Sequence, residues 1–477
     1  MKDFLSRIGP CRWELSMEAQ KGMHVPGLVY GDEYIIDRLE KEEALKQVAN
    51  VACLPGITGY SYAMPDIHWG YGFPIGGVAA FDMEEGIISP GGVGYDISCG
   101  VRIMVSHLTE KEFQPFADKI TAGIFAAVPC GVGSKGVMHL DEKELKRFLS
   151  DGAERAVDRG YGSREDLLSI EDRGRLENAG PERLSGRAIE RGRDQMGTLG
   201  SGNHFVEVQV LDEIYDREVA DLFDLHSGSV AVMIHCGSRG LGHQVCEDHI
   251  RIMSQAMAKY RIQVPDRQLC SVPLASPEAD DYLASMKAAA NFALANRQVI
   301  GARVRDVFQR YFPGVNLTLL YDVSHNMAHL ETHCFRGKRK RFCVHRKGAT
   351  RALPPGHEDL PVKYRKSGQP VIIPGSMGTC SYILTGTALG AEECFASTCH
   401  GAGRIMSRHA AKKTARGEDV RKELESMGIH VMAESYRTLS EESPRAYKDV
   451  ERVVSVVAEA GISRIVARLK PLAVIKG

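Results

Sequence analysis

The stretch GGVGYDISCGVRIMV, residues 91–105, runs from a glycine-rich turn straight into an apolar run of β character. Its glycines permit a tight loop that can turn the Asp96 carboxylate and the Cys99 thiol toward one point. Three further apolar runs end in a turn with polar groups: MIHCGSRG (233–240), LLYDVSHN (319–326) and IIPGSMGTCS (372–381). Because binding sites collect where strands end, we expect a site at these turns.

Helical and strand-like patterns are interspersed along the rest of the chain. Amphipathic spacing predicts helices over residues 33–52, 141–157, 244–260 and 279–311. Short runs rich in apolar β-forming residues predict strands over 101–105, 205–210, 230–234, 317–321 and 371–373. This mixture predicts an α+β fold.

The length of 477 residues would suit about three average domains or one large domain with insertions. Apolar residues make up 43% and charged residues 25%, as in ordinary globular proteins. Residues 158–196 are rich in Arg, Glu and Gly with little periodicity, which indicates a charged insertion or mobile arm. From the residues alone both arrangements stay open, and a charged helical or arm-like insertion is expected around 141–196.

The chain contains no run near the roughly 18 consecutive apolar residues that a membrane span requires, and its first residues, MKDFLSRIGPCRWEL, contain no apolar signal core. We therefore expect a cytoplasmic protein without a membrane partner. The 12 cysteines are scattered rather than packed into a short frame, which favours reduced thiols over disulfides.

The net charge is close to zero, with 60 Lys and Arg against 61 Asp and Glu. This balance argues against a chain that coats nucleic acid non-specifically, so any RNA contact must be local. The densest basic run is RGKRKRFCVHRKGATR, residues 336–351, and a second surrounds Arg187, Arg191 and Arg193. Each run is interpreted either as a solvated face or as such a local contact.

Three histidines at predicted strand ends join Asp96 and Cys99 as candidate metal ligands: His204, His235 and His325. Taken singly, each histidine is more often a hydrogen-bonded structural residue, and a single cysteine is more often a small buried apolar group. Together they form a mixed set of N, O and S donors that suits divalent transition metals, and a thiolate can bridge two cations. Such a set of donors does not by itself indicate whether Mn²⁺, Zn²⁺, Co²⁺ or Ni²⁺ is the bound metal.

Neither common phosphate-loop pattern is met by GVGSKG (131–136) or GSRGLG (237–242). Arg239 is better interpreted as an anion-binding side chain among glycines. In CHGAGR (399–404), Arg404 follows His400 by four positions, about one turn if a helix starts there. A neutral imidazole can attack phosphorus beside a guanidinium, so His400 is a candidate nucleophile; the alternative is a histidine that fills a helix start.

A purine pocket is proposed from polar and aromatic residues in glycine-rich or terminal segments: Asn203, Phe205, Glu207, Ser376, Ser381, Tyr447 and Lys476. The Glu207 carboxylate would favour guanine, since guanine offers it both the N1–H and an exocyclic amine. The Lys476 ammonium would meet the guanine O6.

Nine segments in this order and spacing resemble the RtcB RNA ligase family: MPDIHWGYGFPIGG (64–77), GGVGYDISCGVR (91–102), GSGNHFVEV (200–208), IHCGSRGLGHQ (234–244), DVSHN (322–326), PGSMGT (374–379), CHGAGR (399–404), AYKDV (446–450) and AVIKG (473–477). The resemblance implies an RtcB-like α+β fold of mixed sheets with surrounding helices, in a single catalytic domain over residues 1–477 with the insertion around 141–196. It implies two Mn²⁺ ions bridged by Cys99, one held with Asp96 and His204 and the other with His235 and His325.

By the same resemblance, His400 is the residue that GTP guanylates, and Arg239 and Arg404 position phosphates. His204, Gly401, Ala402 and Gly403 join the GTP contacts. The implied reaction joins RNA 2′,3′-cyclic phosphate or 3′-phosphate ends to 5′-hydroxyl ends through a histidine-GMP and an RNA-ppG end, in tRNA splicing or RNA repair. Archease is an implied partner.

Two rival functions stay open from the residues alone. A metal-dependent RNA phosphodiesterase or end-hydrolase would use the same cations but would need neither His400 nor GTP. A non-catalytic RNA-binding module would use the basic runs and keep the histidines as structural groups, although the near-zero net charge argues against it.

Overall fold

The computed structural model describes residues 1–39 and 43–477, and it confirms the α+β fold. A seven-stranded sheet has the order β1 (Leu5–Gly9), β2 (Arg12–Leu15), β3 (Gly27–Tyr30), β4 (Ile57–His68), β5 (Ile75–Asp82), β13 (Lys338–Lys347) and β12 (Asn326–Phe335). An eight-stranded sheet has the order β11 (Thr318–Ser324), β7 (Gly100–Thr109), β9 (Ser229–Cys236), β8 (Phe205–Ile214), β19 (Ser463–Lys476), β16 (Ser381–Gly386) and β15 (Pro370–Ile373), with β18 (His430–Ala433) also paired to β19. Two small pairs complete the strands: β6 (Ile87–Ile88) with β10 (Val272–Pro273), and β14 (Ala349–Arg351) with β17 (Ser397–Cys399).

All five predicted strands belong to the eight-stranded sheet, as β7, β8, β9, β11 and β15. Their pairing is antiparallel, and parallel pairing occurs at β3–β4 and β18–β19. In the order β11, β7, β9, β8, neighbouring strands bring their polar turns to adjacent positions. This sheet therefore carries the candidate site.

Helices surround the sheets. They are α1 (Glu33–Leu39), α2 (Ala44–Val51), α3 (Glu110–Phe113), α4 (Ala117–Ala127), α5 (Glu142–Asp151), α6 (Ala153–Asp158), α7 (Arg164–Leu167), α8 (Gly186–Gly192), α9 (Arg217–Leu222), α10 (Arg239–Tyr260), α11 (Pro277–Tyr311), α12 (Ala388–Glu393), α13 (Arg408–Thr414), α14 (Gly417–Ser426), α15 (Tyr436–Glu441) and α16 (Val450–Glu459). No helix in residues 1–39 and 43–477 is long and apolar enough to cross a membrane.

The helix predictions differ from the structure mainly at their ends. The helix predicted over 33–52 corresponds to α1 and α2, and its residues 40–42 lie outside the described residues. The helix predicted over 141–157 is broken at Gly152, whose φ of 58° is left-handed. Helix α10 begins five residues earlier than predicted, since packing overrides the low helix propensity of its first glycines. The prediction for α11 was two residues short, because Ser276 caps it and Pro277 is its first residue.

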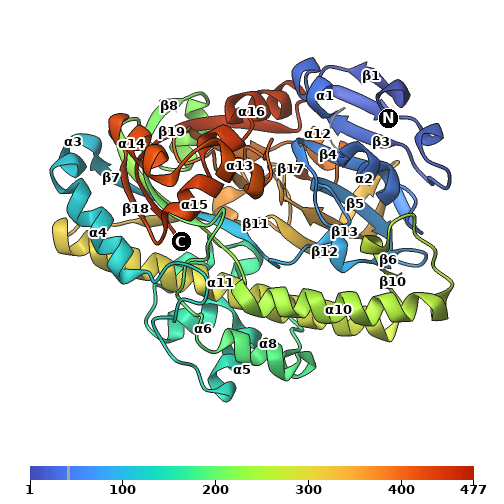
Figure 1. Ribbon diagram of the computed structural model, residues 1–477, viewed down its shortest axis with the longest axis horizontal. Helices are drawn as coiled ribbons and strands as arrows, with labels where there is room; N and C mark the ends of the chain where they lie inside the picture. The colour runs from blue at the N-terminus through green and yellow to red at the C-terminus, as the bar shows by residue number, and fades with distance from the viewer. Residues whose placement is uncertain (40–42) are drawn as a thin grey trace.

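The two longest helices, α10 and α11, pack against each other, and the charged segment 141–196 lies against them with α5, α6 and α8 (Figure 1). The Asn291 amide of α11 donates to the carbonyls of Leu149, Ser150 and Leu176. Helix α11 also holds Asp166 through Arg305, at 2.6 Å. The segment is thus held to α11 at several points, and its status as an insertion in a single domain stays a prediction.

A fully buried ion network stands directly behind the candidate site. The Asp322 carboxylate of β11 accepts from Arg102 at 2.8 Å and from Arg297 at 2.9 Å, and all three side chains are fully buried. The Nη1 group of Arg297 donates to the carbonyls of Ser98 and Cys236, at 2.7 and 2.9 Å. Because a buried guanidinium has a fixed geometry, Arg297 fixes the backbone beside Cys99.

The basic run 336–351 fits the interpretation as a solvated face only in its first part, and its buried arginines fit neither interpretation. Residues Arg336–Arg341, at the tip of the β12–β13 hairpin, are exposed or nearly so, as a solvated face would be. Further along, Arg346 and Arg351 are buried and pair with Glu331 and Glu171. All twelve cysteines are free thiols, as predicted.

Candidate metal centre and nucleotide pocket

The five candidate metal ligands lie at the ends of four neighbouring strands. Cys99 directly precedes β7, His325 directly follows β11, His204 directly precedes β8, and His235 lies near the end of β9. His235 pairs across the sheet with Val101 on one side and Phe205 on the other. Residues far apart in the sequence are therefore brought around one point.

The ligand atoms form two groups that share Cys99. In one group, Cys99, His235 and His325 lie within 4.8 Å of one another; in the other, Asp96, Cys99 and His204 do. The Cys99 Sγ lies 3.2 Å from Nε2 of His235 and 3.4 Å from Nε2 of His204. His235 and His325 approach at 3.2 Å between Nε2 atoms, and His204 Nε2 lies 2.9 Å from the Asp96 carboxylate.

The chemistry of these donors fits divalent cations. Burial holds the pKa of His235 and of His325 well below the ordinary value, so both imidazoles are neutral, as metal ligation requires. Burial, with the Asp96 carboxylate adding to it, raises the pKa of the Cys99 thiol to about 12. A divalent cation would deprotonate such a thiol and offset the charge of the buried carboxylate.

His400 stands beside this centre and is held by a buried carboxylate. Its ring centroid lies 4.8 Å from that of His325. The fully buried Asp66 accepts from His400 Nδ1 at 2.6 Å and from the His400 backbone N–H at 2.9 Å. Burial alone would raise the pKa of the Asp66 carboxyl, but the charge and hydrogen bonds of His400 outweigh it and lower that pKa. Asp66 thereby fixes the proton on Nδ1 and leaves Nε2 free to attack.

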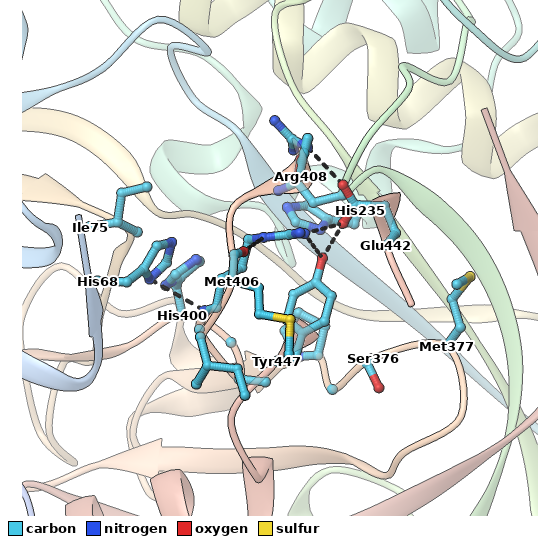
Figure 2. Close-up of a pocket in the computed structure, with 18 of the residues that line it drawn as sticks. His68, Ile75, His235, Ser376, Met377, His400, Met406, Arg408, Glu442 and Tyr447 are labelled. Carbon is cyan, nitrogen blue, oxygen red and sulfur yellow. Dashed lines mark hydrogen bonds and ion pairs between the residues drawn. The ribbon is translucent and has the colours of Figure 1, made fainter. Parts of the chain in front are cut away.

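A cavity of about 530 Å³ opens beside His400. Figure 2 shows His68 and His400 together on one side of it, and Arg408, Glu442 and Tyr447 grouped on another. It is lined by most of the predicted pocket and catalytic residues: Asn203, Phe205, Glu207, Ser376, His400, Gly401, Ala402, Gly403, Arg404, Tyr447 and Lys476. Ser381, His204 and Arg239 are not among its lining residues.

The polar end of the cavity contains two buried groups of opposite charge. Burial raises the pKa of the Glu207 carboxyl to about 7, although Gln209 and Lys476 pull it down. Burial lowers the pKa of Lys476 to about 8, against the pull of Glu442 and Glu207. Ser381 stands behind this end, where its hydroxyl accepts from the Gln209 amide that also donates to Glu207.

Comparison with known proteins shows the family of this chain. The family model described as tRNA-splicing ligase RtcB matches residues 47–477. The chain belongs to the RtcB family. It is 52% identical to the tRNA-splicing ligase RtcB of Thermococcus kodakarensis and covers 99% of both chains. It is 51% identical to that of Archaeoglobus fulgidus over the full length of both chains. It is also 52% identical to the RNA-splicing ligase RtcB of Mycobacterium bovis, over 90% of this chain and all of the relative.

In this RtcB chain, Arg404 is not carried on a helical turn with His400, contrary to the spacing argument. Residues 400–407 form no helix, and α13 begins at Arg408. Gly403 has a φ of 73°, and a Cβ there would lie 2.2 Å from the Asp66 carbonyl oxygen, so the chain turns instead of coiling. Arg404 reaches Glu442 at 2.9 Å and lies over the Tyr447 ring.

Arg239 lies on the Asp96–His204 side of the centre. It is 9% exposed, and its guanidinium donates to the Thr198 hydroxyl and the Gly131 carbonyl, each at 3.0 Å. A Cβ on Gly200 would lie within 2.6 Å of both Arg239 Nη1 and the His204 ring, so only glycine admits this approach. Arg239 therefore lies next to His204, across Gly200, and is not among the residues that line the cavity.

Sequence reasoning missed several residues of the RtcB site, above all Asp66, Glu442 and Arg408. Asp66 was visible only as part of the family segment 64–77, where Asp-Ile-His stands among glycines. Glu442, 1% exposed, accepts from both Arg404 and Arg408 and from the Tyr447 hydroxyl. No pattern around Glu442 distinguishes it from other helix-end acids, so only the fold could identify it.

Proposed function

We propose that this chain is a GTP-dependent RNA ligase that joins 3′-phosphate or 2′,3′-cyclic phosphate ends to 5′-hydroxyl ends. One observation carries the proposal: the Asp66-oriented imidazole of His400 lines the nucleotide cavity and also contacts the metal-ligand cluster at His325. A hydrolase that uses metal-bound water would need neither an oriented histidine nucleophile nor a base pocket beside the cations.

In the first step, Nε2 of His400 attacks the α-phosphorus of GTP. A P–N bond forms, the bond to the β-phosphate oxygen breaks, and pyrophosphate leaves. Asp66 stabilises the positive charge that develops on the imidazole, because its carboxylate already accepts the Nδ1 proton. Arg404 and Arg408, held by Glu442, supply positive charge at the same cavity.

In the second step, an oxygen of an RNA 3′-phosphate attacks the GMP phosphorus, the P–N bond breaks and His400 is released. A cyclic phosphate end must first add water and lose its bond to the 2′-oxygen. In the third step, a 5′-hydroxyl oxygen attacks the RNA phosphorus of the RNA-ppG end, and GMP leaves. The residues Asp96, Cys99, His204, His235 and His325 would hold two Mn²⁺ ions, or Zn²⁺, Co²⁺ or Ni²⁺, whose charge stabilises phosphate oxygens.

The joining reaction itself tests this function. With GTP and Mn²⁺, the protein is expected to join a 3′-phosphate RNA to a 5′-hydroxyl RNA, and ATP is expected to support little or no joining. Denaturing gels of end-labelled RNA measure the product. Release of RNA fragments without joining would favour the metal-dependent phosphodiesterase instead, and equal joining with ATP would refute the guanine pocket.

GTP binding is expected to weaken as pH falls through about 7. The ionised Glu207 carboxylate can accept from guanine N1–H and from the amino group, whereas the protonated acid loses one acceptor. The Kd for GTP should rise by up to about tenfold per pH unit below the Glu207 pKa, as calorimetry between about pH 6 and pH 8 would measure. The Glu207→Gln variant should bind more weakly and without this dependence. A wild-type Kd that is constant over this range would contradict the assignment.

The same proposal includes the setting of the enzyme: a single catalytic domain with an insertion around 141–196, a cytoplasmic location, and tRNA splicing or RNA repair as the task. Archease is proposed as a protein partner on family grounds alone. The relatives' names, which specify tRNA or RNA splicing, support an RNA substrate.

A further inference from the structure

Three aromatic side chains without an assigned catalytic role, Tyr71, Tyr95 and His243, contact one another beside the turn that bears Asp96, and a fourth, Trp69, lies two residues before Tyr71. These four residues are here called the aromatic rim. The rings of Tyr71 and Tyr95 meet edge to face with centroids 5.4 Å apart, and those of Tyr95 and His243 lie 6.0 Å apart. Trp69 is 58% exposed and lines the nucleotide cavity. The hydroxyls of Tyr71 and Tyr95 have no hydrogen-bond partner in the described part of the chain.

The backbone beneath the rim is held by buried polar side chains. Gln47, 4% exposed, donates to the carbonyls of Gly70 and Gly72 and accepts from the Gly70 N–H at 3.0 Å. The buried ammonium of Lys347 donates to the carbonyls of Tyr71, Phe73 and Gly91. Lys347 thus ties the turn that bears Trp69 and Tyr71 to the turn that bears Tyr95. The rings are held in place but are left out of the core.

The rim extends between the two halves of the proposed site. Trp69 follows His68 at the nucleotide cavity, beside His400. Tyr95 immediately precedes the metal ligand Asp96. His243, in the first turns of α10, is close enough to Asp96 for its charge to act on that carboxylate. An RNA end that reacts with the His400-bound GMP at the metal centre would leave the site past these rings.

Two arginines and the Asp96 carboxylate surround His243, and a cation bound at Asp96 would offset the negative charge. Arg191 and Arg239 both act on His243, and Arg191 donates to Gln244 and has no carboxylate partner among the described residues. Glu247 and Asp266 are the acidic groups whose charge reaches Tyr95 and Tyr71. A phosphate backbone would therefore run along the Arg191 edge of the rim.

We propose that the aromatic rim is a stacking platform for the bases of single-stranded RNA next to the reacting end. The inference rests on the proposed function and identifies where its substrate binds. Anchored aromatic rings that are partly or fully exposed, beside an arginine without a carboxylate partner, are elements that single-stranded nucleic acid binding uses. Each base stacked on an aromatic ring contributes enough affinity that its loss weakens binding by about 5- to 100-fold.

The test uses the full-length, Mn²⁺-loaded protein and a fluorescent single-stranded RNA with a 3′-phosphate. Fluorescence anisotropy should give a Kd that is about 5- to 100-fold higher for Tyr71→Leu and for His243→Leu than for the wild type. Tyr71→Phe keeps the ring and should bind RNA like the wild type. Tyr215→Leu, at a tyrosine after β8 that is more exposed than Tyr71 and lies outside the rim, is the control and should leave RNA affinity unchanged.

Two further measurements separate this proposal from the proposed function and from metal loss. Bound Mn²⁺ is measured in every variant, because the rim residue Tyr95 is next to the candidate metal ligand Asp96. The fluorescence of a 2-aminopurine base placed beside the RNA end should be quenched less by Tyr71→Leu than by the wild type. An unchanged RNA affinity in both Tyr71→Leu and His243→Leu would overturn the proposed stacking platform, even if these two variants had lost binding of a protein partner. So would a Tyr71→Phe variant as weak as Tyr71→Leu. Absence of joining by the wild type would refute the proposed function, whatever the RNA affinity of the variants.

Discussion

Replacing His400 by alanine is expected to abolish the covalent GMP label and to lower RNA joining by at least about 10³-fold. No other side chain at the cavity combines a free imidazole Nε2 with a carboxylate that holds the opposite nitrogen, as Asp66 does for His400. His68, its neighbour, has a pKa lowered by burial to about 3, and its Nδ1 is occupied by the Asp66 carbonyl. Incubation with α-labelled GTP and Mn²⁺, followed by denaturing gels, measures the label.

The Asp66→Asn variant is the matched control for this experiment. It keeps the nucleophile but replaces the carboxylate that stabilises its charge, so the label should still form, more slowly by roughly 10²- to 10⁴-fold. A phosphoramidate label is labile in acid and stable in alkali, which distinguishes it from a phosphate ester. A label that persists in His400→Ala would place the nucleophile elsewhere. RNA joining without any label in the wild type would remove the covalent intermediate from the mechanism.

The eight-stranded sheet could be predicted from sequence more completely than the rest of the fold. Its strands β7, β8, β9, β11 and β15 contain short apolar runs rich in β-branched residues, and the glycine-rich turns beside several of them, together with the short length of the runs, favour strands over helices. The seven-stranded sheet was not predicted, because β1 and β2 are short and only partly buried, and β13 lies within the basic run, which does not have the apolar pattern of a strand. The early start of α10 depends on tertiary packing, which outweighs propensity, whereas the break at Gly152 follows from the left-handed backbone that glycine permits.

The residues of the candidate site could also be predicted only in part. Residues whose chemistry is distinctive, such as Cys99 and the histidines at strand ends, could be identified from type and position. Residues that act by holding others could not: Asp66, Glu442 and Lys347 are ordinary charged residues until the fold places them beside His400, Arg404 and the turn at Tyr71. The helical spacing argued for Arg404 was wrong because Gly403 turns the chain.

Removing the Cys99 thiol is expected to empty both halves of the metal centre at once. Its Sγ belongs to the Asp96–His204 group and to the His235–His325 group, and each group keeps only two ligands without it. Cys99→Ala should therefore lose both equivalents of Mn²⁺, and joining should fall at least about 10³-fold because phosphate charge is no longer neutralised. Plasma mass spectrometry of dialysed protein gives the metal content, and circular dichroism checks the fold.

Variants that remove a ligand from only one of the two groups test whether Cys99 is shared between them. His204→Ala removes a ligand from one group only, so the His235–His325 group with Cys99 should still hold close to one Mn²⁺ per chain. His325→Ala should do the same for the opposite group. If Cys99→Ala kept one Mn²⁺ per chain, as either histidine variant is expected to do, the thiolate would serve a single ion and the bridge would be wrong. Cys99→Ala and the single-histidine variants are therefore expected to differ by one bound Mn²⁺ per chain. The reason is that both groups share Cys99, whereas their histidines come from separate strands, β8 for one group and β9 with β11 for the other.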